Sequence, residues 1–413
     1  MAKSKNLTMD RPDIRRHNLS LLLRLVAERG PVSRANLSAE TGMTRATAGS
    51  LVSELIELGL LMETGASGTS RPGRPGVMLE LDGSNVLTIG IEIHIGYLRV
   101  LVRDLAGRER LHHKIAVNAT DSSDAVISRV ADEINHTNET AISKGQKLIG
   151  AAIAVPGVIE PLDGTVVFAP NLGWTNVALL AQLRRLVPSS LELVVDNEAN
   201  LGTLAEFYEG PFAGVGSMAY VFAETGIGVG VMVNHTLWRG ASGGAGELGH
   251  MPIVLEGGRP CACGRNGCWE TLVGIAALVR TVLPDAADRL LADPALDTEG
   301  CANAVRAAAE ADEPGVRERL EEFGKWVGIG VAHILDAFDP EIVMLAGHLS
   351  LIGPWILDTT RRSAREHTMH RVFDRCQIVT SMPGFASSGR GGSLLIAQSV
   401  FSNPGMVLGA KLP

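Results

Sequence analysis

The sequence predicts an α/β protein in two parts, a small helical N-terminal part that ends in a hairpin and a larger body. Two observations lead to this. Helical apolar stripes dominate the first 60 residues, whereas short apolar runs rich in β-branched residues alternate with helical stretches from about residue 85 onward. The length of 413 residues also exceeds one typical domain. We therefore expect a first domain at 1–82 and a second at 83–413.

The N-terminal part is expected to contain three helices and a hairpin. Residues 13–29 have leucines on one helical face, and Gly30 ends this helix. Ser33 and Thr44 are expected to cap the next two helices, because their hydroxyls can accept from free backbone N–H groups. A strand at "LLMET", a Pro/Gly-rich turn and a strand at "VMLEL" complete the order of a winged helix-turn-helix.

This order predicts DNA binding, because such a fold lays its third helix in the major groove. The residues expected to contact DNA lie on that helix and on the wing: Thr44, Arg45, Thr47, Ser50, Arg71 and Arg74. Residues 1–76 carry eleven Lys and Arg against seven Asp and Glu, whereas the whole chain has a net charge of −8. Two alternatives remain, a small protein–protein module and, for the two wing arginines, solvated linker charge.

The body is expected to consist of sheets covered by helices. Strands are predicted at "VLTIGIEI", "YLRVLVRDL", "KLIGAAIAV", "LELVVD", "MAYVFAE", "GVGVMVN" and "EIVMLAG". Helices are predicted around 123–144, 176–187 and 198–208, and at "VRERLEEFGKWVGIGVAHILDAF". The Asp/Ala-rich stretch 284–313 is expected to be a helical excursion on the surface.

A metal site is predicted within residues 250–270. Cys261, Cys263 and Cys268 offer three thiolates on glycine-rich loops, and His250 precedes them by eleven residues. One imidazole and three thiolates complete a tetrahedral Zn²⁺ shell with no open position, which predicts a structural zinc. The alternatives are unrelated buried cysteines or a catalytic zinc with bound water. Cys301 and Cys376 are isolated and are expected to be small core residues.

The stretches "GELGHMPI" and "CACGRNGCWE" resemble the signature of the ROK family, which comprises repressors, open reading frames and sugar kinases. The resemblance extends from about Val86 to the C-terminus, and the N-terminal winged helix matches the repressor branch. It implies a two-lobed actin-like ATPase fold, a zinc-ordered loop beside a sugar pocket, and a homodimer or homotetramer.

The resemblance also implies which residues hold a sugar: Asn171, Asn197, Glu198, Glu247, His250 and Glu270. Carboxylates and amides suit this role because sugars are dense in hydrogen-bond donors and acceptors. His250 would bind zinc through one ring nitrogen and face the sugar with the other. The alternative for each residue by itself is surface or capping polarity.

The kinase machinery is expected to be lost. Active relatives begin with a D-x-G-G-T phosphate loop, whereas this chain has Glu92 in place of the Asp, followed by His94, Ile95 and Tyr97. The second loop, "ETGIGVG", is better preserved, but His348 stands where relatives often have the second glycine of a pair. Glu198 replaces the catalytic aspartate, and its extra methylene displaces the carboxylate by about 1 Å.

The expected function is a sugar-responsive transcriptional regulator of the ROK family that represses carbohydrate-use genes and is not an enzyme. Family repressors that resemble xylose regulators carry similar "DNEAN" stretches, which favours a pentose effector and xylose metabolism. Its expected partners are operator DNA and the sugar. A cytoplasmic location is expected, without a membrane, because no secretory signal and no apolar run of roughly 18 residues is present. The alternatives are an active or bifunctional sugar kinase and a regulator controlled by a protein partner.

Overall fold

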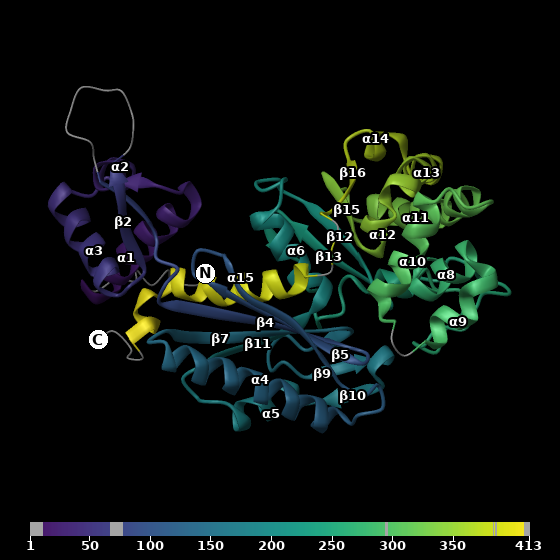
Figure 1. Ribbon diagram of the computed structural model, residues 1–413. Coiled ribbons are helices and arrows are strands. Elements are labelled where there is room, and N and C mark those ends of the chain that lie inside the picture. The colour runs from purple at the N-terminus through teal and green to yellow at the C-terminus, as the bar shows by residue number, and fades with distance from the viewer. Residues whose placement is uncertain (1–10, 67–76, 294–295, 383, 385, 409–413) are drawn as a thin grey trace, which may run out of the picture.

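The computed structural model describes residues 11–66, 77–293, 296–382, 384 and 386–408. The fold is mixed α/β, as predicted, with a helical N-terminal unit in front of a two-lobed body (Figure 1). None of the helices in the described ranges combines the length and the apolar character that crossing a membrane requires.

The N-terminal unit, called the head below, consists of three helices and a three-stranded sheet. The helices are α1 (Arg11–Arg29), α2 (Arg34–Thr41) and α3 (Arg45–Glu57), and the sheet has the order β1 (Val32–Ser33), β3 (Val77–Leu81), β2 (Leu61–Ala66). Both predicted caps are confirmed: Ser33 accepts from the backbone N–H of Asn36 at 3.2 Å, and Thr44 accepts from that of Thr47 at 3.2 Å.

The first half of the body, called lobe 1, is built on a five-stranded sheet. Its order is β11 (Glu192–Asn197), β7 (Lys147–Val155), β4 (Val86–His94), β5 (Tyr97–Asp104), β6 (Glu109–Ala116), with the first three strands parallel. The helices α4 (Ser123–Ser143) and α5 (Leu179–Leu186) cover its lower face in Figure 1. A small sheet of β8 (Val158–Ile159), β9 (Val166–Ala169) and β10 (Trp174–Val177) extends this lobe.

The second half, called lobe 2, has a five-stranded sheet of its own and most of the helices. The sheet order is β14 (Thr236–Leu237), β13 (Ile227–Val233), β12 (Met218–Ala223), β15 (Ile342–Gly347), β16 (Gln377–Thr380). The helices are α7 (Glu270–Val273), α8 (Ile275–Val282), α9 (Ala287–Ala292), α10 (Thr298–Glu310), α11 (Val316–Phe338), α12 (His348–Leu351), α13 (Gly353–His367) and α14 (His370–Phe373).

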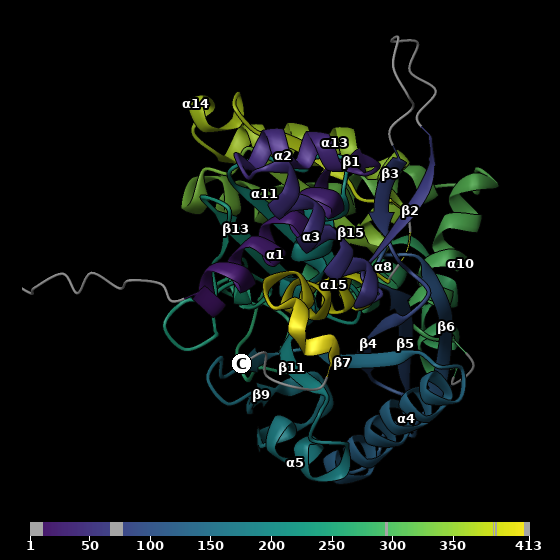
Figure 2. The same cartoon turned by 90° about the vertical axis from the view of Figure 1, so that its left-hand side faces the viewer.

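Two helices join the parts of the molecule. The helix α6 (Glu198–Glu209) packs on β12 and β13 of lobe 2, whereas α15 (Ser387–Ser402) packs on β4 and β7 of lobe 1, and the two helices pack against each other. The far end of α15 lies next to α1 of the head in both views (Figures 1 and 2). A continuous path of packed helices thus runs from α1 of the head through α15 to the joint between the lobes.

The apolar core of the head continues into the body. Leu19, Leu22 and Leu23 of α1 belong to one buried cluster with Val400 and Phe401 of α15. The domain boundary after residue 82 stays a prediction, and the head rests on the body through a shared core rather than through a thin linker alone.

Two element predictions differ from the structure. The helix predicted for 176–187 begins only at Leu179, because the residues before it pair with β9 as the strand β10. The described part of 284–313 is mostly helical, but the predicted surface excursion is wrong for α10, which buries Cys301, Ala302 and Val305 in the core of lobe 2.

Candidate functional site

A small pocket lies between the lobes, next to the ends of β11 and β12. It is lined by all six residues predicted to hold a sugar: Asn171, Asn197, Glu198, Glu247, His250 and Glu270. Gly157, Gly226 and Gly228 also line it. Its volume of about 30 Å³ is far below the roughly 300–1,000 Å³ of occupied ligand sites. The structure therefore brings the six residues together in a narrow cleft.

Asn197 and Glu198 reach the pocket because β11 ends and α6 begins there. The Asn197 side-chain oxygen accepts from the N–H groups of Ala199 at 2.8 Å and Asn200 at 3.3 Å, which caps α6. Its amide nitrogen donates to the Gly157 carbonyl at 3.0 Å. Asn197 is thus a helix cap as well as a pocket residue, and most of its hydrogen-bonding capacity is used within the protein.

Glu198 is in an environment that disfavours its charge. Burial raises the pKa of Glu198 well above its usual value, against the positive charge of His94 and together with the charges of Glu224 and Glu247. A protonated carboxyl can both donate to and accept from a sugar hydroxyl. Because a raised pKa is also typical of a general base, the question of catalysis depends on the phosphate-binding elements.

Asp196 and Arg239 form a charged pair near the pocket that the sequence analysis did not identify. The Asp196 Oδ2 atom accepts from Arg239 Nε at 3.0 Å and Nη2 at 2.6 Å, and its Oδ1 atom accepts from Asn200 Nδ2 at 2.9 Å. Asp196 directly precedes the predicted sugar residues, which is the only signal that its sequence position offers. The pair fixes the loop after β14 against the start of α6.

Glu270 holds the second glycine-rich loop. Its Oε2 atom accepts from the Ile227 N–H at 3.1 Å, and a Cβ atom on Gly226 would lie 2.2 Å from the same oxygen. The glycine at 226 is therefore required for Glu270 to reach the loop.

The four predicted metal ligands converge. The ligand atoms of His250, Cys261, Cys263 and Cys268 all lie within 4.8 Å of one another. The His250 Nδ1 atom is 3.4 Å from the Cys261 sulfur, and the sulfurs of Cys263 and Cys268 are 3.7 Å apart. A tetrahedral Zn²⁺ with bonds of about 2.0–2.3 Å separates its ligands by roughly 3.5–3.8 Å. The residues therefore fit a zinc ion with an all-protein shell.

His250 connects this cluster to the pocket. Its Nδ1 atom faces the cysteines, while its Nε2 atom is 3.8 Å from Glu247 Oε2. Isolated β-bridges between Pro252 and Cys268 and between Pro260 and Asn266 close the loop around the cluster. Zinc at this position would order the loop and fix the orientation of the imidazole toward the pocket.

The predicted position of the first phosphate loop is filled by side chains, which we call the interlobe cluster: Glu92, His94, Tyr97 and Arg99 of lobe 1 and Glu224 of lobe 2. The Glu92 Oε2 atom accepts from Arg99 at 2.5 Å and lies 3.0 Å from His94 Nε2. Both oxygens of Glu224 face lobe 1, one 2.7 Å from His94 Nδ1 and the other accepting from Tyr97 Oη at 2.7 Å. All five residues are buried.

The charges of the cluster are strongly coupled. Although burial opposes it, the charges and hydrogen bonds of Glu224 and Glu92 raise the pKa of His94 to about 9. Burial is likewise outweighed at Glu224, whose pKa falls to about 2 because of His94, Arg99 and the Tyr97 hydroxyl. The cluster therefore holds an imidazolium between two carboxylates at neutral pH.

This arrangement differs from a loop built to bind phosphate. Two buried carboxylates lie at the loop that the sequence motif matches to a phosphate loop, whereas phosphate binding favours free backbone N–H groups. His348 is wholly buried, its Nε2 atom lies 2.9 Å from the Val273 carbonyl, and burial lowers its pKa to about 4. The second loop alone keeps its small residues.

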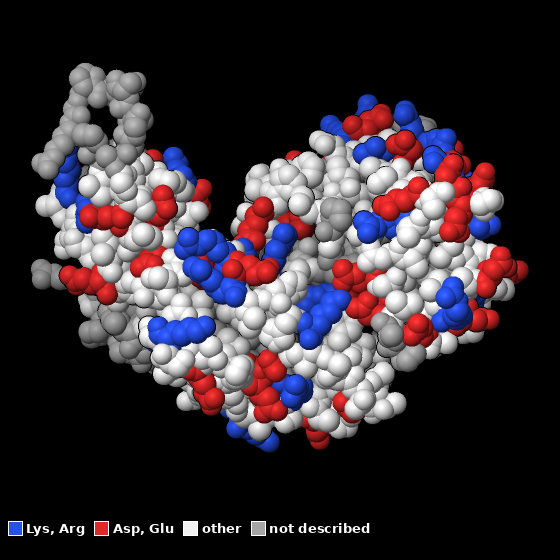
Figure 3. All heavy atoms as spheres, in the orientation of Figure 1, with Lys and Arg blue, Asp and Glu red and all other residues white. Residues whose placement is uncertain are grey.

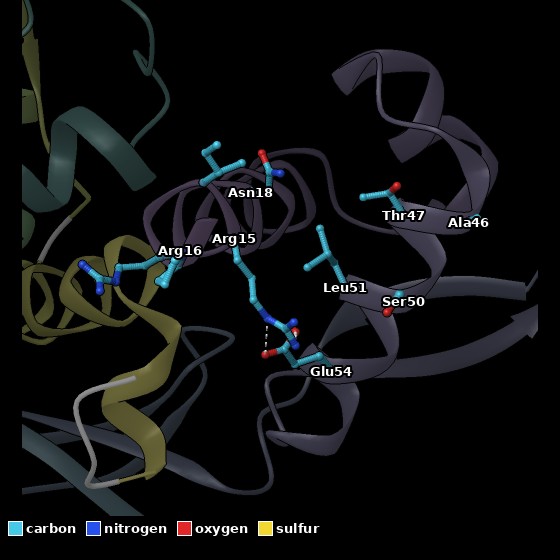
Figure 4. A pocket seen from close by; sticks show the side chains of 10 residues that line it. Arg15, Arg16, Asn18, Ala46, Thr47, Ser50, Leu51 and Glu54 are labelled. Atoms are coloured by element: carbon cyan, nitrogen blue, oxygen red, sulfur yellow. Dashed lines mark hydrogen bonds and ion pairs between the residues drawn. The ribbon is translucent and has the colours of Figure 1, made fainter. Parts of the chain in front are cut away.

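The predicted DNA-contacting helix borders a surface groove of about 860 Å³ between α1 and α3 (Figure 4). Thr47 and Ser50 of α3 line it together with Arg16 and Asn18 of α1, which the sequence analysis did not identify. Their signal is their position on the N-terminal turns of α1, where they flank the apolar stripe of leucines.

The other residues predicted to contact DNA do not line this groove within the described part of the chain. Arg45 is exposed on the first turn of α3, and the Thr44 hydroxyl is used to cap that helix. Arg15 crosses the groove to Glu54, at 2.8 Å (Figure 4). The wing residues Arg71 and Arg74 lie outside the described residues.

The described part of the head carries little excess charge. Residues 11–66 contain seven arginines and six acidic residues, and four of those arginines form ion pairs within the head: Arg15, Arg16, Arg29 and Arg34. In Figure 3, basic and acidic side chains are interspersed over the visible face of the molecule. Most of the surplus of basic charge in residues 1–76 therefore comes from Lys3, Lys5, Arg71 and Arg74, which together with Asp10 lie outside the described residues.

Comparison with known proteins agrees with this geometry. Residues 88–399 match the model of the ROK family. A xylose repressor of Bacillus spizizenii is 29% identical over 391 residues, which cover 94% of this chain and 97% of the repressor.

Two solved structures share the fold. A ROK family transcriptional regulator, a homologue of the Escherichia coli MLC protein, superposes with a TM-score of 0.74 at 23% identity over 96% of this chain and 98% of its own. A ROK family glucokinase from Streptomyces griseus, in complex with glucose and AMPPNP, superposes with a TM-score of 0.64 at 27% identity over 75% of this chain and 98% of its own.

Proposed function

This chain belongs to the ROK family, and from this premise we propose that it is a sugar-responsive, DNA-binding transcriptional regulator that binds a sugar without phosphorylating it. The observation that carries the proposal is the contrast between two neighbouring regions. The pocket keeps all six polar residues suited to a sugar, while the phosphate position beside it is filled by the interlobe cluster. Such a site keeps the side chains that recognise a sugar and lacks a loop that can hold the phosphates of ATP.

The head is the proposed DNA-binding domain, comprising residues 1–82. Thr44, Arg45, Thr47 and Ser50 on α3 would contact base edges or phosphates in the major groove, and Arg71 and Arg74 would enter the minor groove from the wing. In a homodimer or homotetramer, two heads would contact two half-sites of an operator. The nearly full-length similarity to a xylose repressor supports this role and a repressing action on carbohydrate-use genes.

The pocket is the proposed effector site. Asn171, Glu198, Glu247, His250 and Glu270 would accept from and donate to the sugar hydroxyls, with Asn197 placing the first turn of α6. A structural Zn²⁺ held by His250 and the three cysteines would keep the imidazole pointed at the sugar, and the reduced thiolates suit the cytoplasm. The similarity to a xylose repressor favours a pentose.

Sugar binding requires the cleft to open first. A volume of about 30 Å³ admits only water-sized occupants, so a monosaccharide enters only when the lobes separate. The sugar can change DNA affinity only if it binds the two lobe arrangements with different affinity. The same difference must then appear, by reciprocity, as an effect of operator DNA on sugar affinity.

A thermal unfolding screen of the full-length protein tests the proposal. D-xylose, D-glucose, their phosphates and ATP are added one at a time, and a ligand at about 100 times its Kd stabilises the folded state by about 2.7 kcal/mol. We expect stabilisation by D-xylose and none by ATP. Stabilisation by ATP together with sugar-dependent ADP release would establish the kinase alternative, and stabilisation by none of these would favour control by a protein partner.

DNA binding is tested separately with genomic fragments that the protein itself selects. Replacing Thr47 and Ser50 together by Ala is expected to weaken binding to the selected fragment by about 1–3 kcal/mol, since each base contact contributes on that order. The matched control is Ser53→Ala, because Ser53 is exposed on α3 but does not line the groove. Equal binding by both variants would remove α3 as the reading helix.

A further inference from the structure

One helix reaches from the sugar cleft to the core of the head. At the first turn of α15, the Ser388 hydroxyl donates to the Glu198 carbonyl at 2.9 Å. At its last turns, Val400 and Phe401 lie in the buried cluster that contains the leucines of α1. Arg24 of α1 donates to the Ser402 hydroxyl at 2.6 Å. A helix of 16 residues is about 24 Å long, so α15 joins two distant parts of the molecule (Figure 1).

Glu92 holds the first turn of α15. Its Oε1 atom accepts from the Gly389 N–H at 2.6 Å, while its Oε2 atom faces His94 and Arg99. A carboxylate at a helix N-terminus is favourable because it accepts from a free N–H group and faces the positive end of the helix dipole. Glu92 therefore belongs both to the interlobe cluster and to the start of α15.

The contact between β4 and α15 is made backbone against backbone. A Cβ atom on Gly90 of β4 would lie 2.1 Å from the Gly389 carbonyl oxygen. A Cβ atom on Gly389 would lie 3.2 Å from Glu92 Oε1. No flexible side chain lies between the two backbones. A displacement of the Glu92 carboxylate is therefore passed directly to the first turn of α15.

The other end of the cluster belongs to lobe 2. Glu224 follows β12, and its two oxygens interact with His94 and Tyr97 of lobe 1 at 2.7 Å each. The rings of His94 and Tyr97 are stacked, with centroids 4.6 Å apart. When the lobes separate, Glu224 leaves both partners at once and His94 keeps Glu92 as its only carboxylate within the cluster.

We propose that the interlobe cluster and α15 together transmit opening of the sugar cleft to the DNA-binding head. Loss of Glu224 from His94 redistributes the hydrogen bonds of Glu92, which loosens the first turn of α15 and thereby the packing of α15 on α1. Buried charges make this a switch between two states, because a half-broken cluster leaves an uncompensated charge in the interior. The inference rests on the proposed function for the roles of cleft and head.

The head has room to respond. A cavity of about 680 Å³ lies between α1, the turn after β5 and α15, with Arg24, Leu105, Tyr208 and Gln398 among its lining residues. Tightly packed interfaces resist small displacements, whereas an interface beside a cavity can repack. On the side of this cavity the head can therefore shift next to α15, while the shared core of α1 and α15 repacks.

Hydrogen–deuterium exchange of the full-length protein, without sugar or DNA, tests the proposal. Tyr97→Phe removes one of the two lobe 1 contacts of Glu224 and keeps the ring that stacks on His94. We expect exchange of peptides covering 19–26 of α1 and 387–392 of α15 to become faster, on the order of tenfold. Unchanged exchange in α1 would overturn the proposal, whether or not α15 itself responds.

The matched control is Lys114→Met. Lys114 of β6 also joins the lobes, through Asp297 at 2.7 Å and Glu299 at 2.8 Å on the cap and first turn of α10. Its Nζ atom lies 5.2 Å from the centre of the Tyr97 ring, and Glu299 lies 3.9 Å from Arg99. This variant therefore loosens the lobes beside the cluster but leaves the Glu224 contacts and the hydrogen bond from Gly389 to Glu92 in place. We expect exchange in α1 to stay at the wild-type rate in this variant. An equal acceleration in both variants would mean that any loosening of the lobes reaches the head, which would overturn the specific role of Glu92 and α15.

A second variant, Glu224→Gln, tests the same route from the lobe 2 side. Glu224→Gln should act on the same peptides as Tyr97→Phe and more strongly, because it weakens both contacts to lobe 1, and circular dichroism verifies that each variant is folded. Since these readouts need neither sugar nor DNA, they remain valid if D-xylose proves not to be the effector. A protein that binds sugar and DNA but fails the exchange test keeps its proposed function and loses this route of transmission.

Discussion

His94 is the residue on which the interlobe cluster depends for its charge balance. Its two ring nitrogens face Glu92 at 3.0 Å and Glu224 at 2.7 Å, so the doubly protonated imidazolium donates to both carboxylates. A neutral imidazole could donate to only one of them. The protonation state of a single side chain therefore decides whether both lobes are tied to Glu92.

The contribution of His94 to stability is expected to depend on pH. Its folded-state pKa of about 9 exceeds the ordinary value of 6.5, so its stabilisation is complete below about pH 6.5 and is lost as the pH rises through 9. The difference in the free energy of unfolding between wild type and His94→Gln should shrink by about 3 kcal/mol across this window. Urea denaturation at pH 6 and pH 9.5 measures it, and a constant difference would contradict the charge assigned to His94.

Glu198 provides a second test at this scale. Glu198→Asp restores the residue type of an active sugar kinase, yet we expect no sugar-dependent ADP release, because the phosphate position stays filled by Glu92 and Glu224. The same change should weaken sugar binding by about 1–2 kcal/mol, since the shorter side chain misplaces a hydrogen bond. Calorimetry and an ADP-release assay measure both quantities. Turnover by Glu198→Asp would mean that the missing aspartate alone silenced the enzyme.

At the scale of elements, features that depend on neighbouring residues could be predicted from the sequence, and features that depend on tertiary contacts could not. Ser33 and Thr44 could be assigned as caps because capping needs only the neighbouring backbone. The helix α15 was missed because its "SGRGGS" start has three glycines, which disfavour a helix on their own. The reason for them is tertiary: a Cβ atom on Gly391 would lie 1.7 Å from the Leu201 carbonyl oxygen.

Gly90→Ala tests the contact between β4 and α15. Its new methyl group would lie 2.1 Å from the Gly389 carbonyl oxygen, so backbone must shift, and we expect a loss of about 1–3 kcal/mol in the free energy of unfolding. Gly49→Ala on α3 is the matched control, because nothing lies within 4 Å of its added Cβ. It should be neutral or stabilise by up to about 1 kcal/mol. Urea denaturation compares the two, and equal effects would contradict the close approach.

The zinc loop provides another prediction for a single element. Cys263→Ser removes one thiolate of the four-ligand cluster, and we expect loss of bound zinc and a lower midpoint of thermal unfolding. Cys376→Ser is the control, since Cys376 lies outside the cluster. Atomic absorption of the purified proteins measures the metal content. Full zinc occupancy in Cys263→Ser would exclude that residue as a ligand.

At the scale of the whole molecule, the head and the body form one continuous core. Sequence patterns predicted both parts because each has its own periodicity, and the resemblance to a family predicted which residues line the pocket. Neither the sequence patterns nor the family resemblance could predict how narrow the cleft is or that Glu224 contacts lobe 1. These two features depend on the relative position of the two lobes, which are far apart in the sequence. The groups beside the predicted pocket were therefore the least predictable part of the site.

The shared core predicts that the body is unstable alone. Residues 83–413 without the head would expose Val400 and Phe401, which are 0% and 6% exposed in the full chain. We expect this fragment to bind an apolar dye and to unfold at a lower temperature. Val400→Gln with Phe401→Gln should reduce dye binding by the fragment but destabilise the full chain. A fragment as stable as the full chain, without dye binding, would show that the two parts fold independently.

The interlobe cluster has a consequence for what a regulator of this kind can sense. In a kinase of this fold the phosphates beside the sugar come from a diffusing nucleotide, so occupancy of that position follows the energy state of the cell. Here the charges at that position belong to the chain itself and are present in every copy from the moment it folds. If the protein acts as proposed, its response to sugar would not depend on the ratio of ATP to ADP, and it would be the same in starving and in growing cells at one sugar concentration.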